Sequence, residues 1–413
     1  MKNMTYLYMM LFFLVACDKE EPTPMPPVVQ PKIFEKIWNS RIYEAPLENV
    51  GSDNAYLYND WYIVTGDHWS HPDPSLYAYD TRTGKLAWKW TQTGKYQQPG
   101  YNLVGKDNIL ILSDTKGILA FDCNTQQLLW EHIHAEPVKY LGLVGQLPIY
   151  GDYVYKNLSF DNFYGPACMV RYHLKTGIEE RLYTFQIESD GKSPNLSPPA
   201  LWANPNTGDT LLIVVNGRER VDLAPEESPT NLVAYNLSKK KIEWTLEEYT
   251  PWGTNKGYPP SVYNNIVMVA GDWSIYGVDI LTGTVKWRTQ FPNLPWVGNF
   301  TTTKHLLVEN RLYVNPAAHD VMCLNAENGT IIWHNKNAAA NCSPNMLYND
   351  GMLLIGSFGL GSVVIMDGLN GNVIHSERGE RTYYTDVLYD KSTDMYFVQD
   401  FAQAVGFKIN KPK

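Results

Sequence analysis

The 413-residue sequence lacks several features that would assign it to a common functional class. It has no block of basic residues and a net charge of −9, which gives no reason to expect a nucleic acid partner. It has no H-E-x-x-H or comparable histidine spacing for a metal centre, and no G-x-S-x-G motif for a hydrolase nucleophile. The sequence therefore predicts neither catalytic residues nor a metal site.

Cysteine is scarce, and no two of the five cysteines are adjacent. Four of them, Cys123, Cys168, Cys323 and Cys342, are widely and irregularly spaced. An exported compartment would permit disulfides, but this spacing is not typical of a disulfide framework. We expect mostly buried free thiols at these four positions.

The apolar run near the N-terminus, from Tyr6 to Ala16, is too short to cross a bilayer. It ends in Leu14-Val15-Ala16-Cys17, which resembles a bacterial lipobox. The resemblance implies removal of residues 1–16 and lipidation of Cys17; an ordinary signal peptide that contains a cysteine is the alternative. Residues 17–32 are acidic and then proline-rich, which predicts an extended tether. Together these segments predict a cell-envelope protein, lipid-anchored to the outer membrane on its periplasmic or surface-exposed side.

What the sequence does contain is a repeat, shown most clearly by "YAYDTRTGKLAWKW" from Tyr77. Seven ungapped copies align on one polar residue before a turn: Asp80, Asp122, His173, Asn236, Asp279, Asn325 and Asp367. An Asp or Asn side chain suits that position because it accepts hydrogen bonds from backbone amides of the turn. Four residues later, five of the seven copies have glycine, which indicates positive φ. Such a recurring period predicts a repeat fold.

A tryptophan follows four residues after the glycine position in five of the seven copies. A tryptophan at one fixed place in a repeat is typical of a side chain that packs against the next repeat. Two further strand-like runs precede each copy, so each period contains four strands, as in a propeller blade. The tryptophans to which we assign this docking role are Trp38, Trp88, Trp130, Trp244, Trp287 and Trp333.

Trp38 stands 50 residues before Trp88, ahead of the first full copy, whereas the chain after His375 contains only three strand-like runs. The N-terminal strand therefore completes the last blade. The sequence predicts an all-β fold in which residues 33–410 form an eight-bladed β-propeller of four-stranded antiparallel blades.

The stretch from Ala78 to Trp88 resembles A-x-D-x-x-T-G-K-x-x-W, the tryptophan-docking motif of pyrroloquinoline quinone (PQQ) dehydrogenase propellers. The same repeat occurs in the propeller lipoprotein of the outer-membrane barrel assembly machinery. The other copies match in part, and His173, Arg181, Gln126, Lys240 and His375 depart from the motif. The resemblance covers nearly the whole mature chain and is specific for the fold but not for function.

A quinone-dependent enzyme is the least favoured of three functional hypotheses. By resemblance, a quinoprotein alcohol dehydrogenase would need calcium, an Asp base and adjacent half-cystines, and this sequence has no Cys-Cys pair. We therefore expect no cofactor, neither PQQ nor Ca²⁺, and no enzymatic activity.

The insertions between strands two and three, and the connections between blades, are expected on the propeller face opposite the repeat turn. An insertion loop that begins at Asn216 accounts for the longest repeat spacing, the 63 residues from His173 to Asn236. Rigid aromatic and arginine side chains favour protein recognition there. The candidate binding residues are Trp69, Phe163, Tyr164, Arg218, Arg220, Trp252, Tyr258, Trp273, Trp296 and His319. The leading hypothesis is a membrane-anchored scaffold that binds an envelope protein or peptide and is itself a monomer within a complex. A glycan-binding surface lipoprotein is the nearest alternative, because aromatic platforms also suit sugars.

Overall fold

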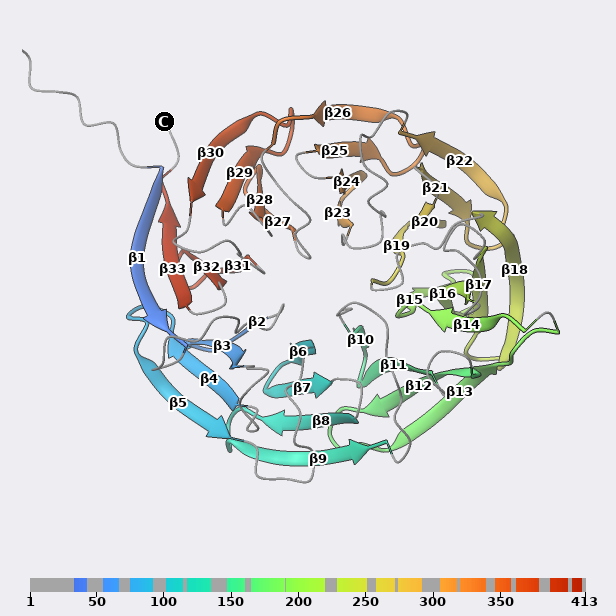
Figure 1. The fold of residues 1–413 in the computed structure, drawn as a ribbon, viewed down its shortest axis with the longest axis horizontal. Helices are drawn as coiled ribbons and strands as arrows, with labels where there is room; N and C mark the ends of the chain where they lie inside the picture. The colour runs from blue at the N-terminus through green and yellow to red at the C-terminus, as the bar shows by residue number, and fades with distance from the viewer. Residues whose placement is uncertain are drawn as a thin grey trace, which may run out of the picture.

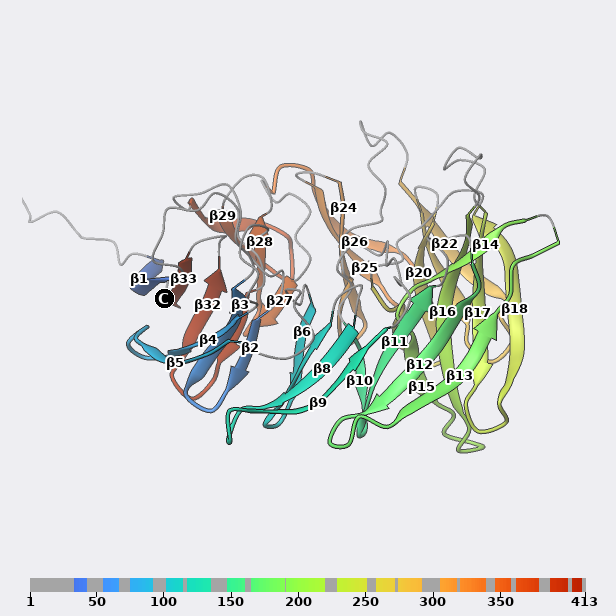
Figure 2. The ribbon, with the colours of Figure 1, turned by 60° about the horizontal axis from the view of Figure 1, so that its bottom comes forward.

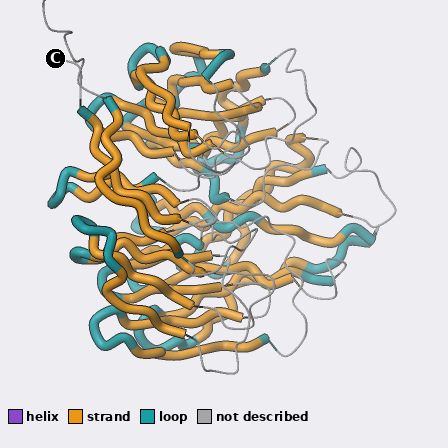
Figure 3. Tube along the Cα trace, turned by 60° about the vertical axis from the view of Figure 1, so that its left-hand side comes forward, coloured by secondary structure: helices purple, strands orange, loops and turns teal. Residues whose placement is uncertain are grey.

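The computed structural model describes the chain in segments that together hold 33 β-strands. The described residues are 33–42, 55–66, 75–91, 102–113, 117–134, 147–159, 165–189, 191–219, 229–250, 258–271, 274–291, 305–317, 320–338, 346–357, 362–378, 387–399 and 403–410. Every regular element among them is a strand, and the strands form a ring of separate sheets around a central axis (Figure 1). Figure 3 shows the same absence of helix along the described trace. The predicted all-β propeller is therefore confirmed.

Each sheet is one blade, and its strands follow one another from the axis outwards (Figure 1). Blade 1 consists of β2 (Ala55–Tyr58), β3 (Trp61–Gly66), β4 (Ser75–Asp80) and β5 (Leu86–Thr91). Blade 2 consists of β6 (Asn102–Lys106), β7 (Ile109–Ser113), β8 (Gly117–Asp122) and β9 (Gln127–Ile133). Blade 3 consists of β10 (Ile149–Tyr150), β11 (Tyr153–Ser159), β12 (Ala167–His173) and β13 (Glu179–Phe185). Blade 4 consists of β14 (Ser193–Leu196), β15 (Ala200–Ala203), β16 (Thr210–Glu219), β17 (Thr230–Asn236) and β18 (Lys241–Thr250).

The second half of the ring continues the same order. Blade 5 consists of β19 (Ser261–Tyr263), β20 (Ile266–Gly271), β21 (Ser274–Asp279) and β22 (Val285–Gln290). Blade 6 consists of β23 (Leu306–Val308), β24 (Arg311–Ala317), β25 (Asp320–Asn325) and β26 (Ile331–Asn335). Blade 7 consists of β27 (Met346–Asn349), β28 (Met352–Ser357), β29 (Ser362–Asp367) and β30 (Val373–Arg378). Blade 8 consists of β31 (Leu388–Asp390), β32 (Met395–Gln399), β33 (Gln403–Ile409) and β1 (Phe34–Arg41).

The two ends of the described chain meet in blade 8, where β1 pairs antiparallel with β33 from Phe34↔Ile409 to Arg41↔Gln403. The amide of Asn410 donates to the carbonyl oxygen of Ile33 at 2.8 Å, where the other blades have a turn. In Figure 1 the blue β1 lies beside the red β33 at the outer rim. The predicted closure of the last blade by the N-terminal strand is confirmed.

Antiparallel pairing places alternate connections on opposite sides of the disc. We call the side with the turns between first and second strands, and between third and fourth strands, the turn face; in blade 1 these are residues 59–60 and 81–85. The opposite side, to which the C-terminal ends of the second and fourth strands point, is the loop face. Figure 2 shows the strands running between these two sides.

The hydrophobic core lies between the blades rather than on the axis. Each of its eight clusters combines buried side chains from two neighbouring blades. For example, Trp88 of blade 1 and Phe121 of blade 2 belong to one cluster, with their ring centroids 5.8 Å apart. The seams between blades therefore carry most of the stabilising apolar burial.

The repeat turns have the predicted chemistry. In all seven copies the polar residue before the turn accepts at least one backbone amide, as Asp80 does from Arg82 and Thr83. The hydrogen bond from the Thr83 hydroxyl is the largest influence that holds the pKa of Asp80 below its usual value. All seven residues at the glycine position have positive φ, including Gln126 (55°) and Lys240 (53°), where glycine is absent.

Replacing Gln126 with glycine should stabilise the protein by about 1 kcal/mol, because a non-glycine residue in this left-handed conformation is strained. Gln126 is exposed and its φ is 55°, so the change removes little packing. The urea midpoint of unfolding would measure the effect. Thr125→Gly, in the same turn but without positive φ, is the matched control and should be neutral or destabilising. Equal midpoints for the two variants would contradict the assigned strain.

Blade 4 departs from the prediction that an insertion loop beginning at Asn216 explains the long repeat spacing. Asn216–Glu219 instead form the end of β16, where they pair with β14. The first strand of this blade is split, because Ser197-Pro198-Pro199 separates β14 from β15 and proline cannot donate to a ladder. The extra residues therefore lengthen the sheet towards the loop face (Figure 2).

Candidate functional site

The turn face is occupied by contacts that dock one blade onto the next. A Cβ atom added to Gly84 would lie 2.6 Å from the Trp38 ring of the preceding blade, so the indole rests directly on this glycine. The Trp38 indole nitrogen also donates to the Thr81 carbonyl at 2.8 Å. Five tryptophan–glycine pairs share this packing: Trp38–Gly84, Trp130–Gly177, Trp244–Gly283, Trp287–Gly329 and Trp333–Gly371. Glycine thus serves both the turn conformation and the close approach of an aromatic ring.

A second side chain fastens the same turns, and the sequence reasoning missed it. The residue two positions after the tryptophan donates to the carbonyl of the docking glycine in four seams, from Ser40, His132, Thr289 and Asn335. His132 Nε2 lies 2.6 Å from the Gly177 oxygen, and Asn335 Nδ2 lies 2.7 Å from the Gly371 oxygen. The sequence signal was a polar residue at a fixed offset from tryptophan, which is visible only when the copies are aligned.

The residue paired with each docking tryptophan on the neighbouring strand is small. Trp38 pairs with Gly406, Trp287 with Gly277 and Trp333 with Cys323. Trp88, Trp130 and Trp244 pair with alanines at 78, 120 and 234. A larger residue stands there only where tryptophan is absent, as Val170 does opposite Arg181. The alanine of the repeat motif is therefore explained by the space that the indole needs.

Three seams depart from the tryptophan–glycine arrangement. In the seam between blades 1 and 2, Gln126 stands at the glycine position. The Trp88 indole nitrogen is buried without a hydrogen-bond partner among the described residues, and its ring packs on Phe121. His375 takes the tryptophan position in blade 7 and stacks on Phe34 at 6.0 Å. Arg181 takes the tryptophan position in blade 3, and other side chains hold the seam between blades 3 and 4.

The seam between blades 3 and 4 is held by polar contacts from a neighbouring part of the sheet. Asn157 in β11 donates to the Ser197 carbonyl at 2.6 Å, next to β14, and the Tyr235 hydroxyl donates to the Leu182 carbonyl at 2.8 Å. The split first strand of blade 4 therefore bridges the two blades where no tryptophan docks.

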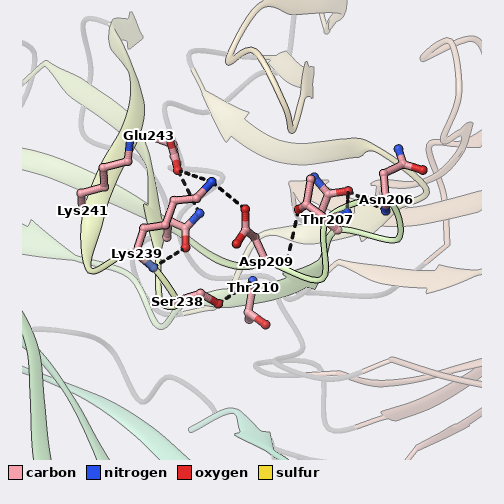
Figure 4. A network of polar contacts seen from close by, with 10 residues as sticks. Asn206, Thr207, Asp209, Thr210, Ser238, Lys239, Lys241 and Glu243 are labelled. Carbon is pink, nitrogen blue, oxygen red and sulfur yellow. Dashed lines mark hydrogen bonds and ion pairs between the residues drawn. The ribbon is translucent and has the colours of Figure 1, made fainter.

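The turns of blade 4 on the turn face are joined by a polar network (Figure 4). Lys239 Nζ donates to Asp209 Oδ2 at 2.7 Å and lies 3.6 Å from Glu243, which also pairs with Lys241. The hydrogen bond from Lys239 is the main reason that the pKa of Asp209 lies below its usual value. These contacts hold the turn in which Lys240 has positive φ.

Most of the predicted binding residues lie outside the described residues. Trp69, Phe163, Tyr164, Arg220, Trp252, Trp273, Trp296 and His319 are in this group, and their assignment stays a prediction. The described strands that flank these residues end on the loop face, as the topology requires. Tyr258 is described as half-buried immediately before β19, and Arg218 lies in β16.

Arg218 joins three parts of the blade 4 extension. Its Nη1 donates to Glu248 Oε1 of β18 at 2.9 Å, and its Nη2 pairs with Glu188, which follows β13. The side chain is 14% exposed, so both carboxylates meet a largely buried guanidinium. Such paired contacts favour a role in holding the extended sheet rather than an open contact point on the surface.

The described cysteines are buried, and burial makes their thiols unreactive. Cys123, Cys168 and Cys323 are buried free thiols, as expected, and Cys342 lies outside the described residues. Burial raises the pKa of Cys123 to about 12 and that of Cys323 to about 11. Thiols that stay protonated at neutral pH are poor nucleophiles and metal ligands.

The described residues do not assemble a metal site of the common kind. Within them, no group of three or more His, Cys, Asp or Glu side chains could hold a metal ion. The motif aspartates, such as Asp279, are already engaged by backbone amides of their turns. The described part of the chain also has no helix long and apolar enough to cross a membrane.

Comparison with known proteins identifies the repeat. The family described as outer membrane protein assembly factor BamB (PQQ_2) matches residues 35–177. No curated protein sequence matches the chain significantly. The family match begins in β1 and ends in the third repeat turn.

Solved structures extend the likeness to the whole ring. BamB from Moraxella catarrhalis aligns with a TM-score of 0.59 and 15% identity, covering 91% of this chain and 100% of that one. The quinohemoprotein alcohol dehydrogenase from Comamonas testosteroni aligns with a TM-score of 0.62 and 12% identity, covering 92% of this chain and 77% of that one. The computationally designed Ika8 protein gives 0.62 and 15%, covering 91% and 100%.

At these identities the likeness shows the fold alone, and the fold is shared by an assembly factor and by enzymes. The chain is therefore an eight-bladed β-propeller that is similar, over residues 35–177, to the family of outer membrane protein assembly factor BamB.

Proposed function

We propose that the chain is a non-enzymatic scaffold of the bacterial cell envelope, which binds a protein or peptide partner through its loop face. The observation that carries this proposal is that the two faces of the propeller differ in what their connections do. On the turn face, the repeat turns are engaged by tryptophan and polar side chains of the preceding blade. The variable, aromatic-rich connections join strands on the other face.

The comparisons support the scaffold over the dehydrogenase. The family match is to an outer membrane protein assembly factor, and the motif aspartates that could serve a metal are committed to turns. Lipid anchoring through Cys17 would hold the propeller at a membrane, with residues 17–32 as tether. Protein binding, rather than sugar binding, agrees with the assembly role named for the matching family.

Photo-crosslinking in intact envelopes would test the binding face. A benzoylphenylalanine at Trp252 or Trp296 should capture a specific partner, whereas the same group at Leu86, which is exposed at the start of β5, should capture none. The Leu86 variant is the control, because it differs only in the face that carries the probe.

Three results would contradict the proposal. Capture by the probe at Leu86, but not by the probes at Trp252 and Trp296, would show that the partner does not bind the loop face. Glycan-array binding that is lost in Trp252→Ala and Trp296→Ala would favour a sugar-binding protein. Dye-linked oxidation of alcohols or sugars after addition of quinone and calcium would make the chain an enzyme.

A further inference from the structure

The seam between blades 2 and 3 contains ionisable side chains, one of them at a position that is apolar in two other seams. Trp130 of β9 docks on Gly177, and two residues later His132 reaches the Gly177 carbonyl. His134 follows the last residue of β9, and the charges of Lys156, Glu179 and Arg181 of blade 3 act on it, so it lies at the same seam. Its Nε2 is buried and has no hydrogen-bond partner among the described residues.

Equivalent positions in two other seams are apolar. The residue four positions after the docking tryptophan is Ile42 in the seam between blades 8 and 1, and Phe291 in the seam between blades 5 and 6. Both are at most 3% exposed. His134 therefore stands at a position that is buried and hydrophobic in these two other seams.

A buried cation faces the same histidine. Lys156 of β11 is 4% exposed and crosses the seam to blade 2, where Nζ donates to Ser113 Oγ at 2.7 Å and to the Gly117 carbonyl at 2.9 Å. Its charge acts on His134 together with those of His132 and Arg181, while the charge of Glu179 acts in the opposite direction. Tyr172 and Cys168 of β12 line the same seam as neutral groups.

We infer that the seam between blades 2 and 3 is an acid-sensitive joint of the ring, which loosens when His134 gains a proton. The protonated imidazole would be a second cation beside the ammonium of Lys156, in a seam that cannot open to water without breaking the Trp130 and His132 contacts. Loosening this joint would alter the spacing of the loop-face strand ends of two adjacent blades. The inference does not depend on which partner the propeller binds.

The direction of the pH effect follows from the folded state. Burial, and then the charge of Lys156, lower the pKa of His134 to about 4 from an ordinary value of about 6.5. The unfolded chain therefore binds the proton first, and stability falls as the pH drops from about 6.5 towards 4. Between pH 7 and pH 5, this one group should raise the unfolding equilibrium constant about 20-fold.

Hydrogen–deuterium exchange of the purified full chain at about pH 7 and about pH 5, corrected for intrinsic rates, would locate the effect. Peptides from β9 and β12 should lose protection at the lower pH, whereas those from β1 and β4, across the seam between blades 8 and 1, where Ile42 takes the equivalent position, should keep it. His134→Phe, which introduces the side chain that Phe291 provides at the equivalent position, should abolish the local loss. His173→Asn, which places at this turn the residue found at Asn236 and Asn325, is the control and should leave the loss intact.

Histidine NMR titration gives a second readout that does not need a variant to fold. Burial lowers the pKa of His305 to about 4 as well, so a global denaturation curve alone would mix two groups. If His134→Phe does not fold, His134→Gln serves instead. Unchanged protection of β9 and β12 at the lower pH would overturn the inference, as would a loss that persists without His134 or an ordinary pKa for this histidine.

Discussion

Replacing Trp38 with alanine is expected to destabilise the protein by about 3–5 kcal/mol, the usual cost of emptying a large aromatic site. The indole is 8% exposed and packs on Phe397 with ring centroids 5.8 Å apart. It also covers Gly84 and Gly406 and donates to the Thr81 carbonyl. The substitution therefore leaves a cavity and an acceptor without its donor at the seam between blades 8 and 1.

The position of Trp38 makes the loss larger than at an ordinary seam. β1 is the strand that closes the ring, and the strands with which it forms blade 8 come from the opposite end of the chain, so no turn connects it to them. Trp287, by comparison, is half-buried and its indole nitrogen has no partner among the described residues. We expect Trp38→Ala to lower the urea midpoint more than Trp287→Ala.

Ile37→Ala is the matched control for this experiment. Ile37 precedes Trp38 on β1, but its side chain is 40% exposed. Its truncation should change the free energy of unfolding by less than about 1 kcal/mol. If the two substitutions lowered the urea midpoint equally, Trp38 would not be the side chain that docks β1.

The propeller could be predicted from sequence because each copy repeats the same local chemistry. Turn residues such as Asp80 and Gly84 mark the register, and the two alternating runs before them mark the inner strands. The eighth blade followed from counting, since Trp38 stands one period before Trp88. Local signals that recur can be checked against one another, and consistency across copies is what makes a fold assignment firm.

The turn glycine on which a docking tryptophan packs could also be found in the sequence, but it belongs to the next repeat. The two non-glycine turns, at Gln126 and Lys240, belong to the copies that follow those of Trp88 and Arg181. The Trp88 indole makes no hydrogen bond among the described residues. Only a comparison between the tryptophan of one copy and the turn of the following copy reveals this relation. A search within single copies cannot find it.

Blade 4 shows where such reasoning fails. The stretch Gly217-Arg218-Glu219 reads as a charged loop, because its partner strand, β14, is formed by residues that have no counterpart in the repeat. Strand pairing over such a separation leaves no local signal. The same limit applies to the loop-face residues, whose identities follow no period and whose candidate roles stay predictions.

Gly371→Ala is expected to cost about 2–5 kcal/mol, although it adds only one methyl group. Gly371 has a φ of +76°, so a Cβ is strained there by about 1–2 kcal/mol. The new atom would also lie 2.4 Å from Trp333 Cε3, which forces the indole out of its place on the turn. Displacing a packed ring in this way adds about 1–3 kcal/mol.

Gly351 separates the two contributions. Its φ is +80°, yet a Cβ there would meet nothing within 4 Å. Gly351→Ala should therefore show only the backbone strain of about 1–2 kcal/mol. A double-mutant cycle of Gly371→Ala with Trp333→Ala should remove the extra cost, because no ring remains to be displaced. Equal costs for the two glycines, or an extra cost that survives without Trp333, would show that the indole does not rest on this turn.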